Sequence, residues 1–190
     1  DYGNPLRLRR ALDRNVRVIV AHCASLGNGI DLDCGPNGPA MSNFTLFARL
    51  MDEPRYAGLL YGDLAAVGQL LRAGDILHTL LTRRDWHARL VYGSDYPLPG
   101  VMPIFSPRRL AAQGFLTDRE AVFLSELRRY NPLLFDLVLK RLLAGGFPVI
   151  IEEAYLLDQV YWPNDDMWGA HYNLLTGYDD LEATVDAINR

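Results

Sequence analysis

Short runs of β-branched and other apolar residues alternate with amphipathic stretches over the first three quarters of the chain. Residues 16–21, 57–62 and 89–93 predict three short buried strands. N-capping side chains, first-turn prolines and apolar residues at helical spacing predict helices over residues 5–13, 42–52, 64–72 and 75–84, and others that begin at Ser106, Thr117 and Asn131. Residues 26–41 are rich in Gly, Pro, Asn and Asp, so this pattern predicts a long loop.

The order of strand, loop and helix indicates βα units and therefore a parallel sheet. Each predicted strand ends in a polar residue, which is His22, Asp63 or Asp95. The carboxyl ends of parallel strands form the catalytic face of a βα barrel and flank the ligand crevice of an open α/β sheet. We therefore expect the His22 and Asp95 side chains to face one pocket.

Each of these residues has two interpretations. His22 either binds a metal or its water, or is a core histidine that bonds to a backbone carbonyl. Asp95 either binds a metal and takes a proton from water, or caps its own loop. Asp63 either lies in a position like that of Asp95 or is just the N-cap of the helix predicted at 64–72. The sequence contains no phosphate-binding glycine motif and no serine-hydrolase elbow.

The net charge of −4 is unevenly distributed, because residues 1–150 carry a net +4 and residues 151–190 a net −8. This shift predicts a boundary near Gly145-Gly146, with one domain over 1–146 and an acidic tail over 147–190. Basic residues are spread over several helices, which argues against nucleic-acid binding. No apolar run approaches a membrane span and none forms a signal-peptide core, so we expect a cytoplasmic protein with reduced Cys23 and Cys34.

Residues 5–143 resemble the C-terminal half of the amidohydrolase-related superfamily of metal-dependent hydrolases. The matching stretches are residues 17–25, 46–56, 90–97 and 130–136, and the most specific of them contains Gly93-Ser94-Asp95-Tyr96-Pro97. The resemblance implies a partial (β/α)8 barrel that hydrolyses a C–N or C–O bond of a small-molecule substrate with a divalent metal, zinc above all. It implies that Asp95 is a metal ligand and general base, and that His22 contacts the metal or its water. Asp63 would follow the next strand, where the family has no fixed metal ligand, so the resemblance leaves it as a substrate-contact candidate.

The family's first-strand His-x-His pair is absent from this sequence, which leaves Asp95 and His22 as two ligands where a catalytic zinc usually has three. We therefore expect weak metal binding. A non-catalytic α/β domain is the first alternative. An incomplete barrel also exposes sheet edges, which predicts a homo-oligomer or pairing with the tail.

The acidic tail resembles part of a papain-like cysteine peptidase domain of the bacteriocin-processing type. The resemblance lies in residues 147–155 and 168–180, and it implies that His171 is the catalytic histidine. The nucleophilic cysteine segment of that family is absent, and a thiolate–imidazole pair needs both members. A cysteine-peptidase-like module centred on His171 is the second alternative, and a hairpin-like edge with an aromatic cluster is the structural interpretation of the same residues.

Overall fold

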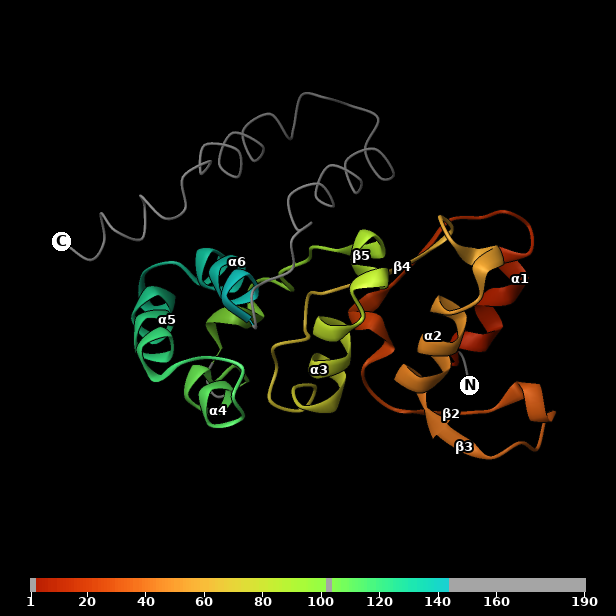
Figure 1. Ribbon diagram of the computed structural model, residues 1–190, viewed down its shortest axis with the longest axis horizontal. Coiled ribbons are helices and arrows are strands. Elements are labelled where there is room, and N and C mark those ends of the chain that lie inside the picture. Colours follow the sequence, from red (N-terminus) through yellow and green to blue (C-terminus); the bar gives the residue numbers. More distant parts are fainter. Residues whose placement is uncertain (1–2, 102–103, 144–190) are drawn as a thin grey trace, which may run out of the picture. The chain divides into compact units, whose positions relative to one another are not determined.

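The computed structural model describes residues 3–101 and 104–143 (Figure 1). Its strands are β1 (Val18–Val20), β2 (Asn28–Ile30), β3 (Ala40–Ser42), β4 (Leu60–Asp63) and β5 (Leu90–Val91). Its α-helices are α1 (Arg9–Leu12), α2 (Asn43–Met51), α3 (Asp75–Thr82), α4 (Pro107–Ala112), α5 (Asp118–Tyr130) and α6 (Pro132–Leu142). Short 3-10 helices are η1 (Pro5–Leu8), η2 (Ala21–Ala24), η3 (Leu32–Cys34), η4 (Pro54–Tyr56), η5 (Arg84–Arg89) and η6 (Leu98–Gly100).

The three predicted strands form one parallel sheet in the order β1-β4-β5, with Val18 opposite Leu60 and Gly62 opposite Leu90. The predicted partial (β/α)8 barrel is nevertheless wrong. In the described ranges this sheet has three strands of two to four residues, and the other sheet is the antiparallel hairpin β2-β3. A barrel wall needs longer strands, and about eight of them, before tilt and stagger can close it.

Two local predictions also fail. The predicted loop at 26–41 contains the hairpin β2-β3, because backbone pairing over three residues on each side overrides the turn-rich composition. The predicted helix at 64–72 is instead a series of turns. Its Leu70 N–H donates to the Ile104 carbonyl at 3.0 Å rather than to a helical partner, so a tertiary contact replaces the helical bond.

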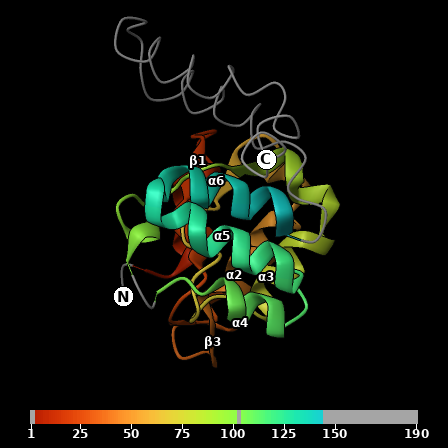
Figure 2. The same cartoon turned by 90° about the vertical axis from the view of Figure 1, so that its left-hand side faces the viewer.

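The helix starts follow the sequence closely. Hydroxyl and amide side chains accept backbone N–H groups at four N-termini, from Ser42 before α2, Ser106 before α4, Thr117 before α5 and Asn131 before α6. Thr117 and Glu120 form the complete capping box. The helix α5 packs on both α4 and α6 (Figure 2), and Phe105 meets Phe135 edge to face at 6.2 Å between ring centroids. No described helix is long and apolar enough to cross a bilayer.

The central strand β4 packs against α2 and η2. A Cβ at Gly62 would lie 2.6 Å from Cys23 Sγ and 2.9 Å from Phe47 Cζ, so only glycine fits at this position. Phe47 in turn meets Trp86 edge to face, and both rings are fully buried. The apolar layer beneath the sheet therefore holds the segment that follows β1 directly against β4.

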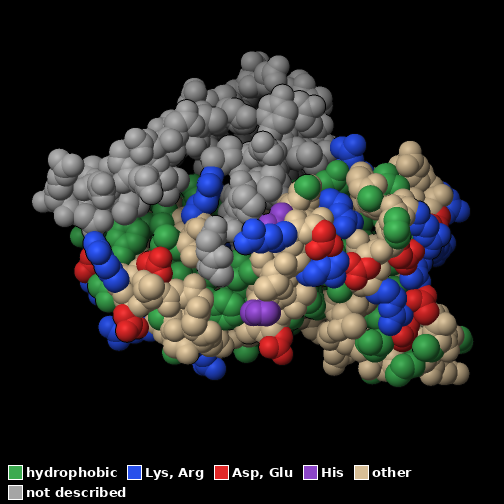
Figure 3. All heavy atoms as spheres, viewed as in Figure 1, with side chains coloured by type: hydrophobic (Ala, Val, Ile, Leu, Met, Phe, Trp, Pro, Cys, Tyr) green, Lys and Arg blue, Asp and Glu red, His purple; other side chains and the backbone are tan. Residues whose placement is uncertain are grey.

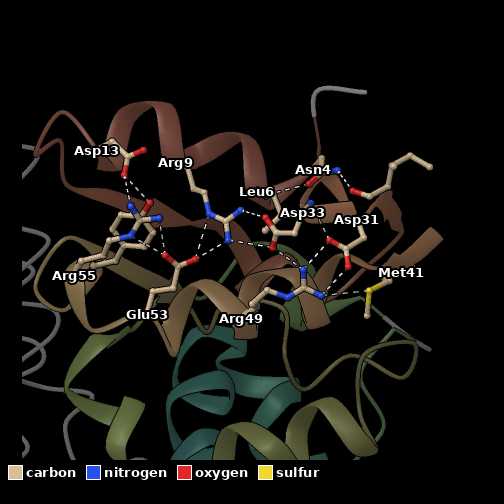
Figure 4. Close-up of polar contacts among 12 residues, drawn as sticks. Asn4, Leu6, Arg9, Asp13, Asp31, Asp33, Met41, Arg49, Glu53 and Arg55 are labelled. Atoms are coloured by element: carbon tan, nitrogen blue, oxygen red, sulfur yellow. Dashed lines mark hydrogen bonds and ion pairs between the residues drawn. The ribbon is translucent and has the colours of Figure 1, made fainter. Parts of the chain in front are cut away.

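A network of arginine and carboxylate side chains ties η1-α1 to η3 and α2 (Figure 4). Arg9 bonds to Asp33 and to Glu53, and Arg49 bonds to Asp31 and Asp33 at 2.7 Å. Arg49 holds the pKa of the Asp31 carboxyl below its ordinary value. On the side of the molecule where α1 and α2 lie, acidic and basic side chains are intermixed on the surface (Figure 3). This agrees with a network in which each charged group has a partner of opposite charge.

Candidate functional site

Three polar side chains meet at the carboxyl edge of the parallel sheet. His22 lies in η2 directly after β1, Asp63 is the last residue of β4, and Asp95 follows β5. Because the three strands run in the same direction, their ends lie on one edge, as the sequence led us to expect. The structure therefore brings together His22 and Asp95 from the two outer strands, with Asp63 from the strand between them.

The imidazole of His22 faces a different carboxylate from each of its nitrogens. Nδ1 lies 4.0 Å from Asp63 Oδ2, and Nε2 lies 4.0 Å from Asp95 Oδ2. The three side chains are between 22 and 31% exposed, so the cluster is half-buried. His22 Nδ1 is buried and has no hydrogen-bond partner. This nitrogen therefore does not bond to a backbone carbonyl, as it would in a core histidine.

The backbone at this edge is strained. Five described non-glycine residues have positive φ, and four of them are His22, Cys23, Ala24 and Asp95, with φ between 50° and 55°. Such conformations cost of order 1–3 kcal/mol each and persist where the surrounding structure enforces them, often at functional sites. Cys23 supplies part of that enforcement, because it is fully buried and its Sγ donates to the Asp63 carbonyl at 3.3 Å.

Two contacts fix the carboxylate of Asp63. Its Oδ1 accepts the Ala65 N–H at 2.6 Å, and a Cβ at Gly93 would lie 2.6 Å from the same oxygen. Asp63 therefore caps a turn rather than a helix, and it needs glycine at position 93. Burial raises the pKa of the Asp63 carboxyl, while the Ala65 N–H and the nearby His22 and Lys140 lower it.

Sequence reasoning missed Arg72, which lies beside the cluster. Its Nη1 donates to Ser25 Oγ at 2.7 Å and its Nε to Gln69 Oε1 at 3.1 Å. Burial lowers the pKa of this guanidinium, and the charge of Asp95 acts against that effect. Arg72 thus places a positive charge beside the site, and both of its hydrogen-bond acceptors are neutral side chains. Only its position shows this, because the chain contains 18 arginines and no motif marks this one.

Sequence reasoning also missed a buried ion pair behind the sheet edge. Lys140 and Asp136, one turn apart on α6, are 1% and 0% exposed and lie 2.5 Å apart. The Lys140 ammonium also lies 4.8 Å from the centre of the Tyr92 ring. The only sequence signal for this pair is that Lys140 is the single lysine of the chain, on the apolar face of a helix.

Asp136 gives the protein a predictable pH dependence. Burial raises the pKa of its carboxyl from 3.8 to about 6, although Lys140 lowers it. The folded state therefore binds a proton that the unfolded chain has lost, so the free energy of unfolding should fall as the pH rises from about 4 to about 6. Urea unfolding across that range, compared with Asp136→Asn, checks this. If the free energy of unfolding of Asp136→Asn falls with pH as steeply as that of the wild type, groups other than Asp136 cause the pH dependence.

The described residues offer few metal ligands. No three His, Cys, Asp or Glu side chains within residues 3–101 and 104–143 are placed so that they could hold a metal ion together. His22 Nε2 and Asp95 remain as two ligands, since Asp63 faces the other ring nitrogen. The peptidase-like histidine, His171, and the boundary near Gly145-Gly146 lie outside the described residues.

His78 and His87 do not belong to this cluster. His87 is buried and bonds to the Leu80 carbonyl at 3.0 Å, and His78 is exposed on α3. Neither Cys23 nor Cys34 forms a disulfide bond.

Comparison with known proteins adds no relative. No family model matches the chain, and neither a curated protein nor a solved structure matches it. Its function therefore has to be argued from the geometry of the site.

Proposed function

We propose that this chain is a hydrolase, in which water attacks a C–N or C–O bond of a small-molecule substrate at the Asp63–His22–Asp95 cluster. The observation that carries the proposal is the position of His22, with each ring nitrogen 4.0 Å from a different carboxylate. The strained backbone at His22 and Asp95 supports it, because such strain is otherwise selected against.

A separation of 4.0 Å is too long for a direct hydrogen bond but suits one bridging water. A water between His22 Nε2 and Asp95 would bond to both groups. As its oxygen attacks the substrate carbon, its proton passes to Nε2, because an imidazole is well suited to exchange protons near neutral pH. His22 then gives this proton to the departing nitrogen or oxygen, and Asp63 stabilises the imidazolium between the two steps.

The donor set does not by itself fit a catalytic zinc ion. Such an ion takes about three protein ligands at ~2 Å together with water. Within the described residues only His22 Nε2 and Asp95 face a common point, so the set is one ligand short. The chemistry proposed here therefore uses the protein's own groups. The metal-bound roles that the resemblance implies for Asp95 and His22 remain a separate proposal, which added zinc tests directly.

Asp95→Asn tests the proposed function. We expect kcat/KM of the 190-residue chain for p-nitrophenyl acetate and for a p-nitroanilide to fall roughly 10-fold to 100-fold, because the amide no longer orients water as the carboxylate does. Asp85→Asn, in an exposed ion pair on η5, is the matched control and should keep the wild-type rate.

The same assays in EDTA and with added zinc chloride separate the two forms of the proposal. Equal rates in both buffers agree with chemistry by the protein's own groups. A rate that requires zinc would overturn the metal-independent mechanism and support the metal-bound roles of Asp95 and His22. A wild-type rate no higher than that of buffer would contradict hydrolysis altogether and leave a non-catalytic α/β domain.

A further inference from the structure

Lys140 is the only lysine of the chain, beside 18 arginines, and it is almost completely buried. Its ammonium has three partners, which are Asp136 Oδ2 at 2.5 Å, the Gly93 carbonyl at 2.6 Å and the Ala65 carbonyl at 3.4 Å. An ammonium has three N–H donors and no acceptor, so each donor has one oxygen. The three donors of an ammonium radiate from one nitrogen and suit acceptors grouped around a single point, whereas the donors of arginine are spread over the plane of the guanidinium.

The two carbonyls belong to the segments that carry the candidate carboxylates. Gly93 lies two residues before Asp95, and Ala65 lies two residues after Asp63. Ala65 also donates its N–H to Asp63, and the Cα of Gly93 packs against the same carboxylate. One ammonium on α6 is therefore bonded to both segments, each within two residues of a carboxylate that faces His22.

We propose that Lys140 is a positioning residue, whose ammonium holds the segments after β4 and β5 so that Asp63 and Asp95 face opposite nitrogens of His22. A purely structural ion pair would need only Asp136. The bonds to Gly93 and Ala65 link the pair to the geometry of the site. The effect on catalysis rests on the proposed hydrolase function, but the positioning is a statement about structure and has its own readout.

The test uses the full chain with selective isotope labels. Gly93-Ser94 is the only Gly-Ser pair in the sequence, so ¹³C-carbonyl glycine with ¹⁵N-serine gives a single amide signal that reports the Gly93 carbonyl. Histidine labelled at ¹³Cε1 gives one ring signal for each of four histidines, and the loss of one signal in His22→Gln assigns that of His22. Labelled lysine gives one ammonium signal.

In Lys140→Met we expect the Gly93 carbonyl signal and the His22 ring signal both to move, and kcat for p-nitrophenyl acetate to fall about 10²-fold with little change in KM. Tyr56→Phe is the control, since it removes the bond from Tyr56 to Asp13, remote from the site, and should move neither signal. The double variant Asp136→Asn/Lys140→Met removes both buried charges and should show the same shifts in a neutral interior.

Two results would overturn the inference. A folded Lys140→Met or double variant with an unmoved His22 signal would reduce Lys140 to a structural role. If neither variant folds, proton exchange of the Lys140 ammonium is measured in the wild type. An ammonium bonded to three oxygens should exchange its protons slowly, so rapid exchange would contradict the three bonds. Absence of hydrolysis with shifted signals would reject the proposed function alone, whereas hydrolysis with unmoved signals would reject only the positioning role.

Discussion

His22→Gln is expected to lower kcat/KM for p-nitrophenyl acetate by about 10²–10⁴-fold, the usual contribution of a positioned acid–base group. Glutamine keeps similar bulk and can still bond to water, but it cannot take a proton from it. The loss should appear mainly in kcat, because the substrate need not touch the imidazole before the chemical step. Initial rates over a range of substrate concentrations separate kcat from KM.

The matched control for this variant is His78→Gln, on the exposed side of α3. It makes the same chemical change away from the sheet edge and should keep the wild-type rate. Thermal unfolding of both variants checks that the fold is intact. A His22→Gln protein that folds and hydrolyses the ester at the wild-type rate would remove His22 from the mechanism.

Asp136→Ala is expected to lower the free energy of unfolding by about 3–5 kcal/mol, the range found when one partner of a buried ion pair is removed. The Lys140 ammonium would keep two carbonyl partners but lose its counter-charge at a position that is 1% exposed. Urea unfolding at pH 7, where Asp136 is charged, measures this loss. The variant also leaves a cavity, which adds to the effect.

Asp85→Ala is the control for that experiment, because it removes a carboxylate from the exposed pair with Arg83. Exposed pairs contribute about 0–1 kcal/mol, so the two alanine variants should differ severalfold in their cost. A loss below about 1 kcal/mol in Asp136→Ala would mean that the lysine sheds its proton or reaches water, and that the pair is not a buried charge pair at neutral pH.

Local rules predicted the helices well where a side chain caps its own segment. Thr117 and Asn131 satisfy N–H groups within three residues, so neighbouring residues alone determine those helix starts. The same rules failed over 64–72, where the Leu70 N–H bonds to Ile104, more than thirty residues away. Sequence spacing carries no information about such a partner, so this segment could not be assigned from local pattern.

The candidate site was only partly visible in the sequence. Asp95 and His22 were found because each follows an apolar run, and that position marks the edge of a parallel sheet. Arg72 and Lys140 carry no comparable signal, since one lies in a turn and the other on a helix far along the chain. Their roles depend on distances between segments, which only packing sets.

The sequence alone determined that three short apolar runs would be strands and that each would end in a polar residue. Only the tertiary structure decided that three strands form a small sheet and not a barrel wall, and that His22 lies between Asp63 and Asp95. The reason is the separation along the chain between the residues that interact. Strand formation and helix capping depend on neighbours within a few residues, whereas sheet order, buried charge pairing and the facing of side chains depend on contacts between distant segments.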